Sequence, residues 1–468
     1  MEAMLLTRLG ELRDGAAALD AGELPVPQQA AGEVLIAVSC CGVCHTELDE
    51  IEGRTPPPRL PIIPGHQVVG RVIAAPAGSD LRAGERVGVA WIFSACGQCD
   101  YCREGRENLC AQFVATGRDA HGGYAQFMTA PAGFVHPLPD ELGDVEAAPL
   151  LCAGAVGYRA LSLCRLEDGQ ALGLTGFGAS GHLVLQMARA RFPRSPIHVF
   201  TRNAAERALA LDLGATWAGA ADAQTPTLLH ATIDTTPAWA PLRAALRNLR
   251  PGGRLVVNAI RKEAADAAVM ADIDYAGELW LEKTVQSVAN VTRADVRDCL
   301  ALAARAGIRP KTRVYALADA NLALADIKFG RHAGARCCGW PVSFAAQPLF
   351  VVRPQAQHLH DLLGFEHLID EAMLDVDSSG QGAGKIADQF LVRRRVLEGI
   401  LPDDAQQCLR FFLQAGRGQL AGVFLGLPGV DQPPCHQSSS VAQASTGSAM
   451  PSLIDSRRPG TDSRYSVS

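Results

Sequence analysis

Four cysteines lie close together in the segment "SACGQCDYCREGRENLC", with the spacing C-x2-C-x2-C-x7-C: Cys96, Cys99, Cys102 and Cys110. Short loops of this kind let successive thiolates converge on one tetrahedral ion. An iron–sulfur run has a shorter last gap that is followed by Pro, and disulfides within the C-x2-C pairs are disfavoured in a reducing compartment. The spacing therefore predicts a structural zinc, which would stabilise a lobe that has few apolar side chains.

A second group of metal-binding residue types is spread along the chain. Cys44 lies in "SCCGVCHTELDEIEG", His66 in "PIIPGHQVVG" and Cys152 in "PLLCAGAVGY". Each residue alone is a weak signal, because a single cysteine on an apolar run is usually a buried small hydrophobe. A single histidine is more often a satisfied polar residue than a ligand. The three residues can form a metal site only if the fold brings them together.

The segment "LGLTGFGASGHLVLQMARA" contains Gly176, Gly178 and Gly181 in the pattern G-x-G-x-x-G. The pattern follows an apolar strand and opens an apolar helix, which is the context that dinucleotide binding requires. Its glycines allow a tight turn and a close approach of pyrophosphate to the helix N-terminus. The segment therefore predicts a dinucleotide site.

The end of the next predicted strand, "IHVFTRN", bears on the choice of dinucleotide. NAD usually requires an acid at this place for the ribose hydroxyls. The chain has Thr201 and Arg202 instead, and a hydroxyl with a guanidinium can accept a 2′-phosphate. We expect NADP to be preferred and NAD to be possible, with a solvated surface arginine as the alternative interpretation of Arg202.

The elements that must position these residues fall into several regions. Residues 1–152 are rich in Gly and Pro, with short runs typical of an irregular β domain. Residues 153–292 alternate strand-like and helical runs, which predicts a doubly wound parallel sheet of the α/β class. Residues 293–345 hold two helical stretches and then irregular chain. Three amphipathic helices are expected within 346–430, and the Ser/Pro-rich residues 431–468 are expected to form a disordered tail.

Charge and composition exclude several classes of protein. The net charge is −6 and no basic stripe is present, so nucleic acid is not an expected partner. No apolar run approaches the roughly 18 residues of a membrane span, and the start of the chain lacks the pattern of a signal peptide. In a chain that is not expected to be secreted, fourteen cysteines favour metal ligands and free thiols over a disulfide framework. We expect a cytoplasmic protein.

Together, "CGVCHTE", "PGHQ", the four-cysteine segment, "HGGYAQF", "LLCAG" and the glycine-rich turn resemble the zinc-dependent alcohol dehydrogenases of the medium-chain dehydrogenase/reductase superfamily. The likeness runs from about residue 3 to about residue 335, and it is strongest to bacterial members near the cinnamyl-alcohol-dehydrogenase-like branch. It implies a GroES-like catalytic domain over 1–152, with a zinc lobe at 94–112. It also implies a Rossmann domain over 153–292 and a return to the catalytic domain over 293–345.

The resemblance implies a catalytic zinc held by Cys44, His66 and Cys152, with the fourth position open. Two thiolates and one imidazole suit zinc better than magnesium or calcium. With the four-cysteine site, the expectation is two zinc ions per chain. Cys40 and Cys41 are then expected in the core.

Three neighbours of Cys44 receive catalytic roles from the resemblance. Thr46 matches the hydroxyl that hydrogen-bonds the alcohol oxygen and begins a proton relay; an ordinary turn hydroxyl is the alternative. His45 matches a position that approaches the cofactor pyrophosphate. Asp49 stands where many relatives carry a histidine at the outer end of the relay, and a carboxylate there can accept the proton.

Three further residues are expected to support the site. Glu47 matches an acid that hydrogen-bonds the ligand histidine and fixes its tautomer. Gln67 replaces a glutamate that is common in relatives, and its neutral amide predicts that ligand exchange at the metal is slower or follows another route. Trp91 aligns with an aromatic wall of the substrate pocket and would favour slender primary alcohols; a core tryptophan is the alternative.

The resulting prediction is a zinc-dependent enzyme that interconverts primary alcohols and aldehydes with NAD(P). We expect a homodimer or homotetramer with a small-molecule substrate. Two alternatives remain at this point. One is a zinc-free quinone or enoyl reductase on the same scaffold, and the other is a non-catalytic NADPH-binding protein.

Overall fold

The computed structural model describes residues 1–330 and 335–339, which belong to one unit, Met1–Pro348. The helices predicted within 346–430 and the tail predicted at 431–468 lie outside the described residues. No helix in the described part is both long and apolar enough to cross a membrane.

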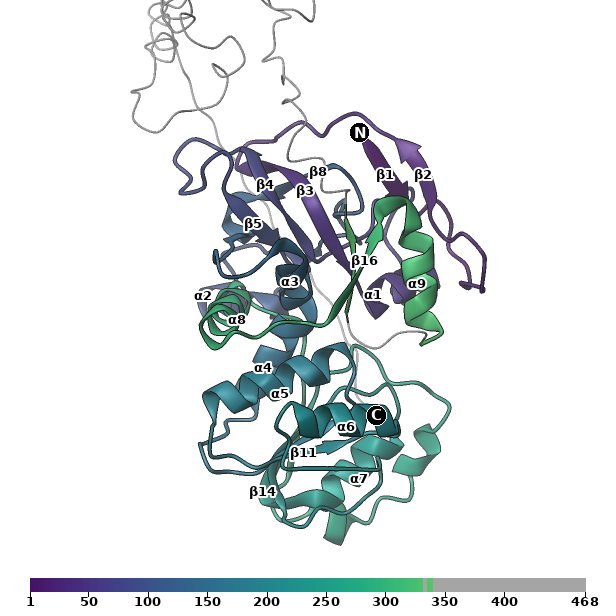
Figure 1. The fold of residues 1–468 in the computed structure, drawn as a ribbon, viewed down its shortest axis with the longest axis vertical. Coiled ribbons are helices and arrows are strands. Elements are labelled where there is room, and N and C mark those ends of the chain that lie inside the picture. Colours follow the sequence, from purple (N-terminus) through teal and green to yellow (C-terminus); the bar gives the residue numbers. More distant parts are fainter. Residues whose placement is uncertain (331–334, 340–468) are drawn as a thin grey trace, which may run out of the picture. The chain divides into compact units, whose positions relative to one another are not determined.

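The first sheet is built around β3 (Glu33–Val43), whose "EVLIAVSCCGV" is rich in the β-branched and apolar residues that suit a buried strand. Its strand order is β16-β17-β3-β4-β5-β9, and β8 also pairs with β3 (Figure 1). The other strands are β4 (Val68–Ala74), β5 (Arg86–Val89), β8 (Phe127–Pro131), β9 (Val135–Pro137), β16 (Thr312–Ala316) and β17 (Ala335–Gly339). A separate hairpin pairs β1 (Glu2–Leu5) with β2 (Asp20–Glu23).

The strand β17 joins the late part of the chain to its beginning. Cys338 lies opposite Cys41 in an antiparallel register, and β16 runs parallel to β17. The prediction of irregular chain after the two helical stretches was therefore wrong at 335–339. The helices themselves are present as α8 (Arg293–Ala306) and α9 (Ala320–Lys328). Both Cys41 and Cys338 are buried in the core, as is Cys40.

The second sheet is parallel, with the order β12-β11-β10-β13-β14-β15. Its strands are β10 (Leu172–Thr175), β11 (Ile197–Phe200), β12 (Trp217–Gly219), β13 (Leu229–Asp234), β14 (Leu249–Val257) and β15 (Thr284–Ser287). The four residues of β10 are all buried, as expected for a central strand covered on both faces. The order reverses between β10 and β13, which confirms the predicted doubly wound sheet.

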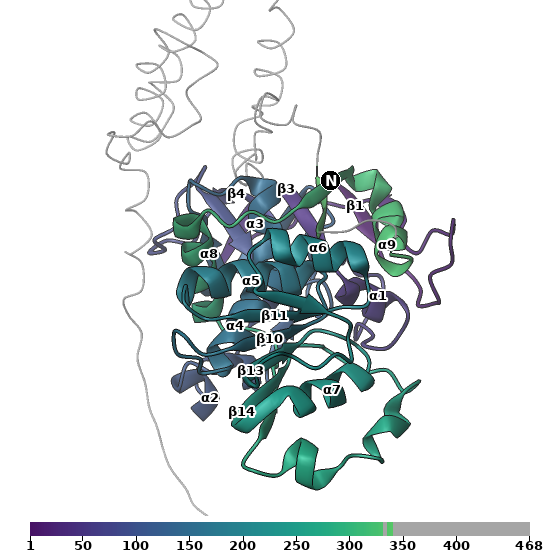
Figure 2. The ribbon, with the colours of Figure 1, turned by 60° about the horizontal axis from the view of Figure 1, so that its bottom comes forward.

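Helices alternate with these strands: α5 (Ala179–Arg191) follows β10, α6 (Ala204–Asp212) follows β11 and α7 (Ala240–Asn248) follows β13 (Figure 2). Because such crossovers are right-handed, the reversal in strand order puts α7 on the face opposite α5 and α6. Three shorter or connecting helices, α1 (His45–Ile51), α3 (Asp144–Pro149) and α4 (Ala155–Leu163), carry or flank the residues of the candidate site.

Candidate active site

The three scattered metal-binding residues converge. One Sγ from each of Cys44 and Cys152 and one ring nitrogen of His66 all lie within 4.8 Å of one another. Cys44 directly precedes α1, His66 lies two residues before β4, and Cys152 lies in the helical segment Leu150–Gly154 between α3 and α4. The His66 Nε2 is 3.2 Å from the Cys152 Sγ, and His66 is 1% exposed.

Glu47 holds two members of this cluster at once. Its Oε1 lies 2.6 Å from the His66 Nδ1, and its Oε2 accepts a hydrogen bond of 2.8 Å from the Cys44 backbone N–H. The first contact leaves the His66 Nε2 facing the sulfurs. A carboxylate on the outer nitrogen of a ligand histidine is the usual arrangement around protein-bound metals.

The electrostatics of the three residues suit a cation. The hydrogen bond from the Cys152 thiol lowers the pKa of Cys44, against the effect of burial, and His66 lowers it further. Burial opposes protonation of His66, but the Glu47 carboxylate and the Cys44 sulfur raise the pKa of His66 overall. Two soft sulfurs and an oriented imidazole form a donor set that fits zinc.

Thr46 is placed beside this cluster. Its Oγ1 is 3.6 Å from the Cys44 Sγ, and the residue is buried. His45 is exposed at the first position of α1. The relay and pyrophosphate roles that the resemblance implies for these residues stay predictions.

One oxygen of the Asp49 carboxylate is already hydrogen-bonded to two arginines. Its Oδ1 accepts hydrogen bonds of 2.5 Å from the Arg54 Nε and 2.9 Å from the Arg261 Nε. Arg261 follows β14 of the parallel sheet, 212 positions away in the sequence. Asp49 therefore ties α1 to the nucleotide-binding side of the molecule, a contact that sequence reasoning missed.

Gln67 and Trp91 border the cluster in different ways. Gln67 is buried and covers Gly42 of β3, where a Cβ would come within 2.7 Å of the Gln67 Oε1. The Trp91 ring stands edge-on to the His66 ring, with centroids 6.2 Å apart, and it also contacts Phe113 at 5.7 Å. Trp91 thus lies next to the candidate ligands, as a pocket wall must.

Sequence reasoning also missed Glu50, which is 1% exposed in the last turn of α1. Burial raises the pKa of Glu50, and the nearby Glu47 carboxylate raises it further. Neither of its carboxylate oxygens has a hydrogen-bond partner among the described residues. The spacing of four positions from Thr46 was the signal that could have revealed it, because such residues share a helix face.

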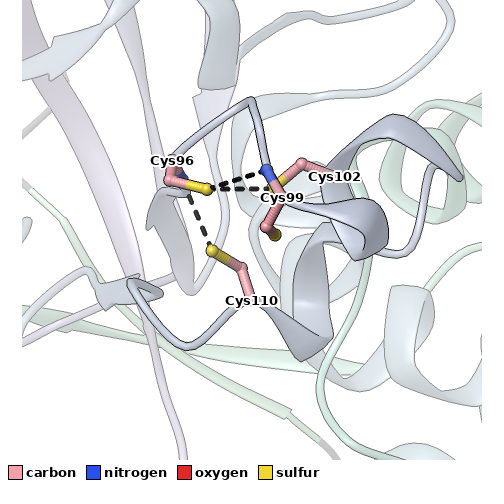
Figure 3. Close-up of side chains that lie close together, drawn as sticks. All are labelled: Cys96, Cys99, Cys102 and Cys110. Carbon is pink, nitrogen blue, oxygen red and sulfur yellow. Dashed lines mark hydrogen bonds between the residues drawn. The ribbon is translucent and has the colours of Figure 1, made fainter.

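The four-cysteine lobe is a separate, closed cluster (Figure 3). The four sulfurs lie within 4.8 Å of one another, between β6 (Ile92–Ser94), α2 (Asp100–Arg103) and β7 (Val114–Ala115). Backbone N–H groups of Gln98 and Cys99 lower the pKa of Cys96 to about 6. Four sulfur ligands fill the tetrahedral coordination of a structural zinc and leave no position for a substrate.

The glycine-rich turn has the geometry that its sequence predicts. Gly176 directly follows β10 and has a φ of +83°, and Gly178 directly precedes α5. A Cβ on Gly181 would come within 2.5 Å of the Gly176 carbonyl oxygen, so the strand and the helix approach closely only with glycine there. This turn lies at the point where the strand order reverses, and the first N–H groups of α5 suit a pyrophosphate.

The end of β11 is more complex than the sequence indicates. Arg202 is exposed, whereas Thr201 is buried and hydrogen-bonds the Glu206 carboxylate. Arg207 donates to the backbone carbonyls of Thr201 and Arg202 at 2.8 and 3.0 Å. An acid and a second guanidinium thus lie at this edge, both from the first turn of α6, where a search limited to the strand end does not find them.

Comparisons with known proteins agree with this architecture. The model of the alcohol dehydrogenase GroES-like domain matches residues 30–140. A probable alcohol dehydrogenase AdhA of Mycobacterium tuberculosis is 45% identical over 316 residues, which is 66% of this chain and 89% of the relative. An alcohol dehydrogenase of Geobacillus stearothermophilus is 34% identical over 316 residues, 65% of this chain and 90% of the relative.

Among solved structures, a cinnamyl alcohol dehydrogenase from Sorghum bicolor matches with a TM-score of 0.61 and 26% identity, over 72% of this chain and 97% of the other. The chain belongs to the zinc-type alcohol dehydrogenases of the medium-chain dehydrogenase/reductase superfamily. It is an oxidoreductase that acts on small-molecule alcohols with zinc and a nicotinamide dinucleotide. A zinc-free reductase and a non-catalytic nucleotide-binding protein are not favoured.

Proposed function

We propose that this enzyme interconverts primary alcohols and aldehydes, with Cys44, His66 and Cys152 as the ligands of a catalytic zinc. The observation that supports this most strongly is the convergence of two sulfurs and one imidazole nitrogen within 4.8 Å. Cys96, Cys99, Cys102 and Cys110 are proposed to hold the second, structural zinc.

The zinc, when bound, supplies a Lewis acid that favours the alkoxide form of an alcohol near neutral pH. The residues of the chain orient the reacting groups. Glu47 fixes the His66 ring through its Nδ1. The Thr46 hydroxyl, whose Oγ1 lies next to the Cys44 Sγ, is proposed to accept the hydroxyl proton of the alcohol while it passes its own proton on. Asp49 is proposed as the outer end of that relay.

The proposed cofactor site uses Gly176, Gly178 and Gly181 for the pyrophosphate, with His45 approaching from α1. Thr201 and Arg202 are proposed to favour NADP, because the exposed guanidinium of Arg202 is free to meet a 2′-phosphate. Glu206, hydrogen-bonded to the Thr201 hydroxyl, is the specific observation in favour of NAD as the second candidate.

Oxidation of NADPH and NADH, measured at saturating levels of a panel of primary aldehydes, tests the function and the cofactor together. We expect turnover with a higher kcat/KM for NADPH. Arg202→Gln should raise the KM for NADPH about tenfold, because a charged hydrogen bond is lost, and should leave the KM for NADH unchanged.

Arg194→Gln is the matched control, since Arg194 is an exposed arginine that pairs with Asp168 on the protein surface. The control should change neither KM. A preference for NADH that Arg202→Gln does not alter would contradict the NADP proposal, and the absence of turnover with every aldehyde would contradict the function.

Trp91 supports the proposed preference for primary alcohols. The indole stands beside His66, and it is proposed to form one wall of the substrate pocket next to the zinc. A ring of this size leaves less room for a branched carbinol than for a slender one.

A homodimer is the proposed assembly, and a homotetramer is the alternative. The edge strand β15 is exposed at all four positions, and Trp280 beside it is 56% exposed. An exposed edge strand offers unpaired N–H and C=O groups to another chain, so two copies can pair there about a two-fold axis. The cytoplasmic location stays a prediction.

A further inference from the structure

Glu50 is a buried acid that the proposed reaction does not use. The other acidic side chains of α1 and of its C-cap all have partners: Glu47 contacts His66 and the Cys44 N–H, Asp49 contacts two arginines, and the C-cap residue Glu52 contacts Lys328. Glu50 is 1% exposed, yet neither of its oxygens has a hydrogen-bond partner among the residues that the structure describes. Buried polar atoms in native proteins nearly always have partners, so this exception calls for a ligand or a water.

Glu50 lies near the candidate zinc ligands. It follows Thr46 by four residues and Glu47 by three, so the three side chains share one face of α1. Thr46 and Glu47 on this face contact Cys44 and His66. The Glu50 carboxylate also interacts electrostatically with His66 and Cys44.

Trp91 and Arg118 also lie close to His66 and Glu50. The Arg118 guanidinium stacks 5.8 Å from the centre of the Trp91 ring, and the edge of Trp91 meets His66. Arg118 attracts the Glu50 carboxylate, but its Nε and one terminal nitrogen donate to Asp119 at 2.9 and 2.8 Å. The Trp91 Nε1 is also buried without a partner among the described residues.

We propose that Glu50 is a specificity-determining residue that accepts a hydrogen bond from a second donor group of the substrate. The substrate class is then a primary alcohol that carries a further hydroxyl or ammonium group, such as a diol or an amino alcohol. The proposal rests on the proposed alcohol oxidation. A site with an unpaired buried acceptor discriminates against a substrate that lacks the donor, because binding then leaves the acceptor unpaired.

The test compares 1,4-butanediol with 1-butanol, and 1,3-propanediol with 1-propanol, in the zinc-loaded full-length enzyme. We expect kcat/KM to be about tenfold higher for the diol, because the monohydric alcohol leaves one buried acceptor unpaired. In Glu50→Met, which removes the acceptor and keeps the shape, this ratio should fall to near one. The change should come from a higher KM for the diol, with the kcat for the monohydric alcohol retained.

Thermal unfolding gives a readout that is independent of activity. Replacing an unpartnered buried carboxylate by an apolar side chain should raise the Tm of the substrate-free enzyme. Glu52→Gln is the matched control on the same helix, since the Glu52 carboxylate accepts hydrogen bonds from Lys328 and the Leu12 N–H at 2.5 and 3.1 Å. This control should lower the Tm and leave the diol preference unchanged.

Each other outcome has a definite meaning. A diol preference that is absent, or that survives Glu50→Met, overturns the proposal and assigns Glu50 to a bound water. Loss of zinc together with all activity in Glu50→Met also overturns it, because Glu50 then serves the metal. A wild-type enzyme that oxidises neither alcohol contradicts the proposed function, whereas equal oxidation of both contradicts this inference alone.

Discussion

At the scale of single residues, the candidate site depends on carboxylates whose partners differ. Both oxygens of Glu47 have partners in His66 and the backbone of Cys44, whereas Glu50, three positions later, has no hydrogen-bond partner in the described part of the chain. Two acids on one turn of helix thus have opposite energetics. The first stabilises the fold and orients a ligand, and the second destabilises the free enzyme.

His136 provides a pH-dependent effect on stability that is separate from the site. It lies on β9, is 7% exposed, and has a pKa lowered from the ordinary 6.5 to about 4, chiefly by burial and then by Arg293 and Arg297. Between these two values the unfolded chain binds a proton that the folded chain does not. Burial of the neutral His136 therefore costs no stability above about pH 6.5. As the pH falls from there toward about 4, the free energy of unfolding decreases.

We predict that the unfolding free energy of the wild type falls by about 2 kcal/mol more than that of His136→Gln between about pH 7.5 and about pH 5. Urea unfolding at the two pH values measures the difference. Equal losses in the two proteins would show that His136 is not held neutral by burial.

At the scale of helices and strands, Asp49 connects α1 to the segment after β14. Arg261 approaches it from the side of the parallel sheet, and Arg54 approaches it from the end of α1 itself. Both donate to the same Oδ1, but only the Arg261 contact joins the helix of the candidate zinc site to the sheet of the candidate cofactor site.

We expect Arg261→Gln to raise the KM for the cofactor about two- to fivefold, the worth of a partly exposed ion pair. Arg54→Gln is the control because it loses a contact to the same oxygen without releasing the β14 segment. Steady-state kinetics of Arg261→Gln, Asp49→Asn and the double variant Asp49→Asn/Arg261→Gln give the coupling between the two residues. The same change in cofactor KM for both arginine variants would argue against a link between α1 and the parallel sheet.

Local sequence patterns were sufficient to predict the helices and strands that have a regular periodicity. The apolar strand, Gly176 turn and helix α5 follow in the predicted order, and the strand order of the parallel sheet confirms the doubly wound class. The pairing of β17 with β3 was not predictable, because Cys338 and Cys41 meet only in the folded chain. The contact of Arg261 with Asp49 is equally non-local, and Glu206 was missed because a helix turn brings it back to Thr201.

At the scale of the whole molecule, the described residues combine two large sheets, two small two-stranded sheets and two clusters of metal-ligating side chains. The cluster of Cys44, His66 and Cys152 draws its members from three separated segments, so it forms only when the chain is folded. The four-cysteine cluster comes from a single stretch of sequence and can form locally. The two clusters should therefore respond differently to substitution.

The most direct test is the zinc content of the purified protein together with alcohol oxidation. The account predicts two zinc ions per chain in the wild type, one for each cluster. It predicts one ion, a folded protein and no alcohol oxidation in Cys44→Ser or Cys152→Ser. Two ions and undiminished alcohol oxidation in either variant would contradict it.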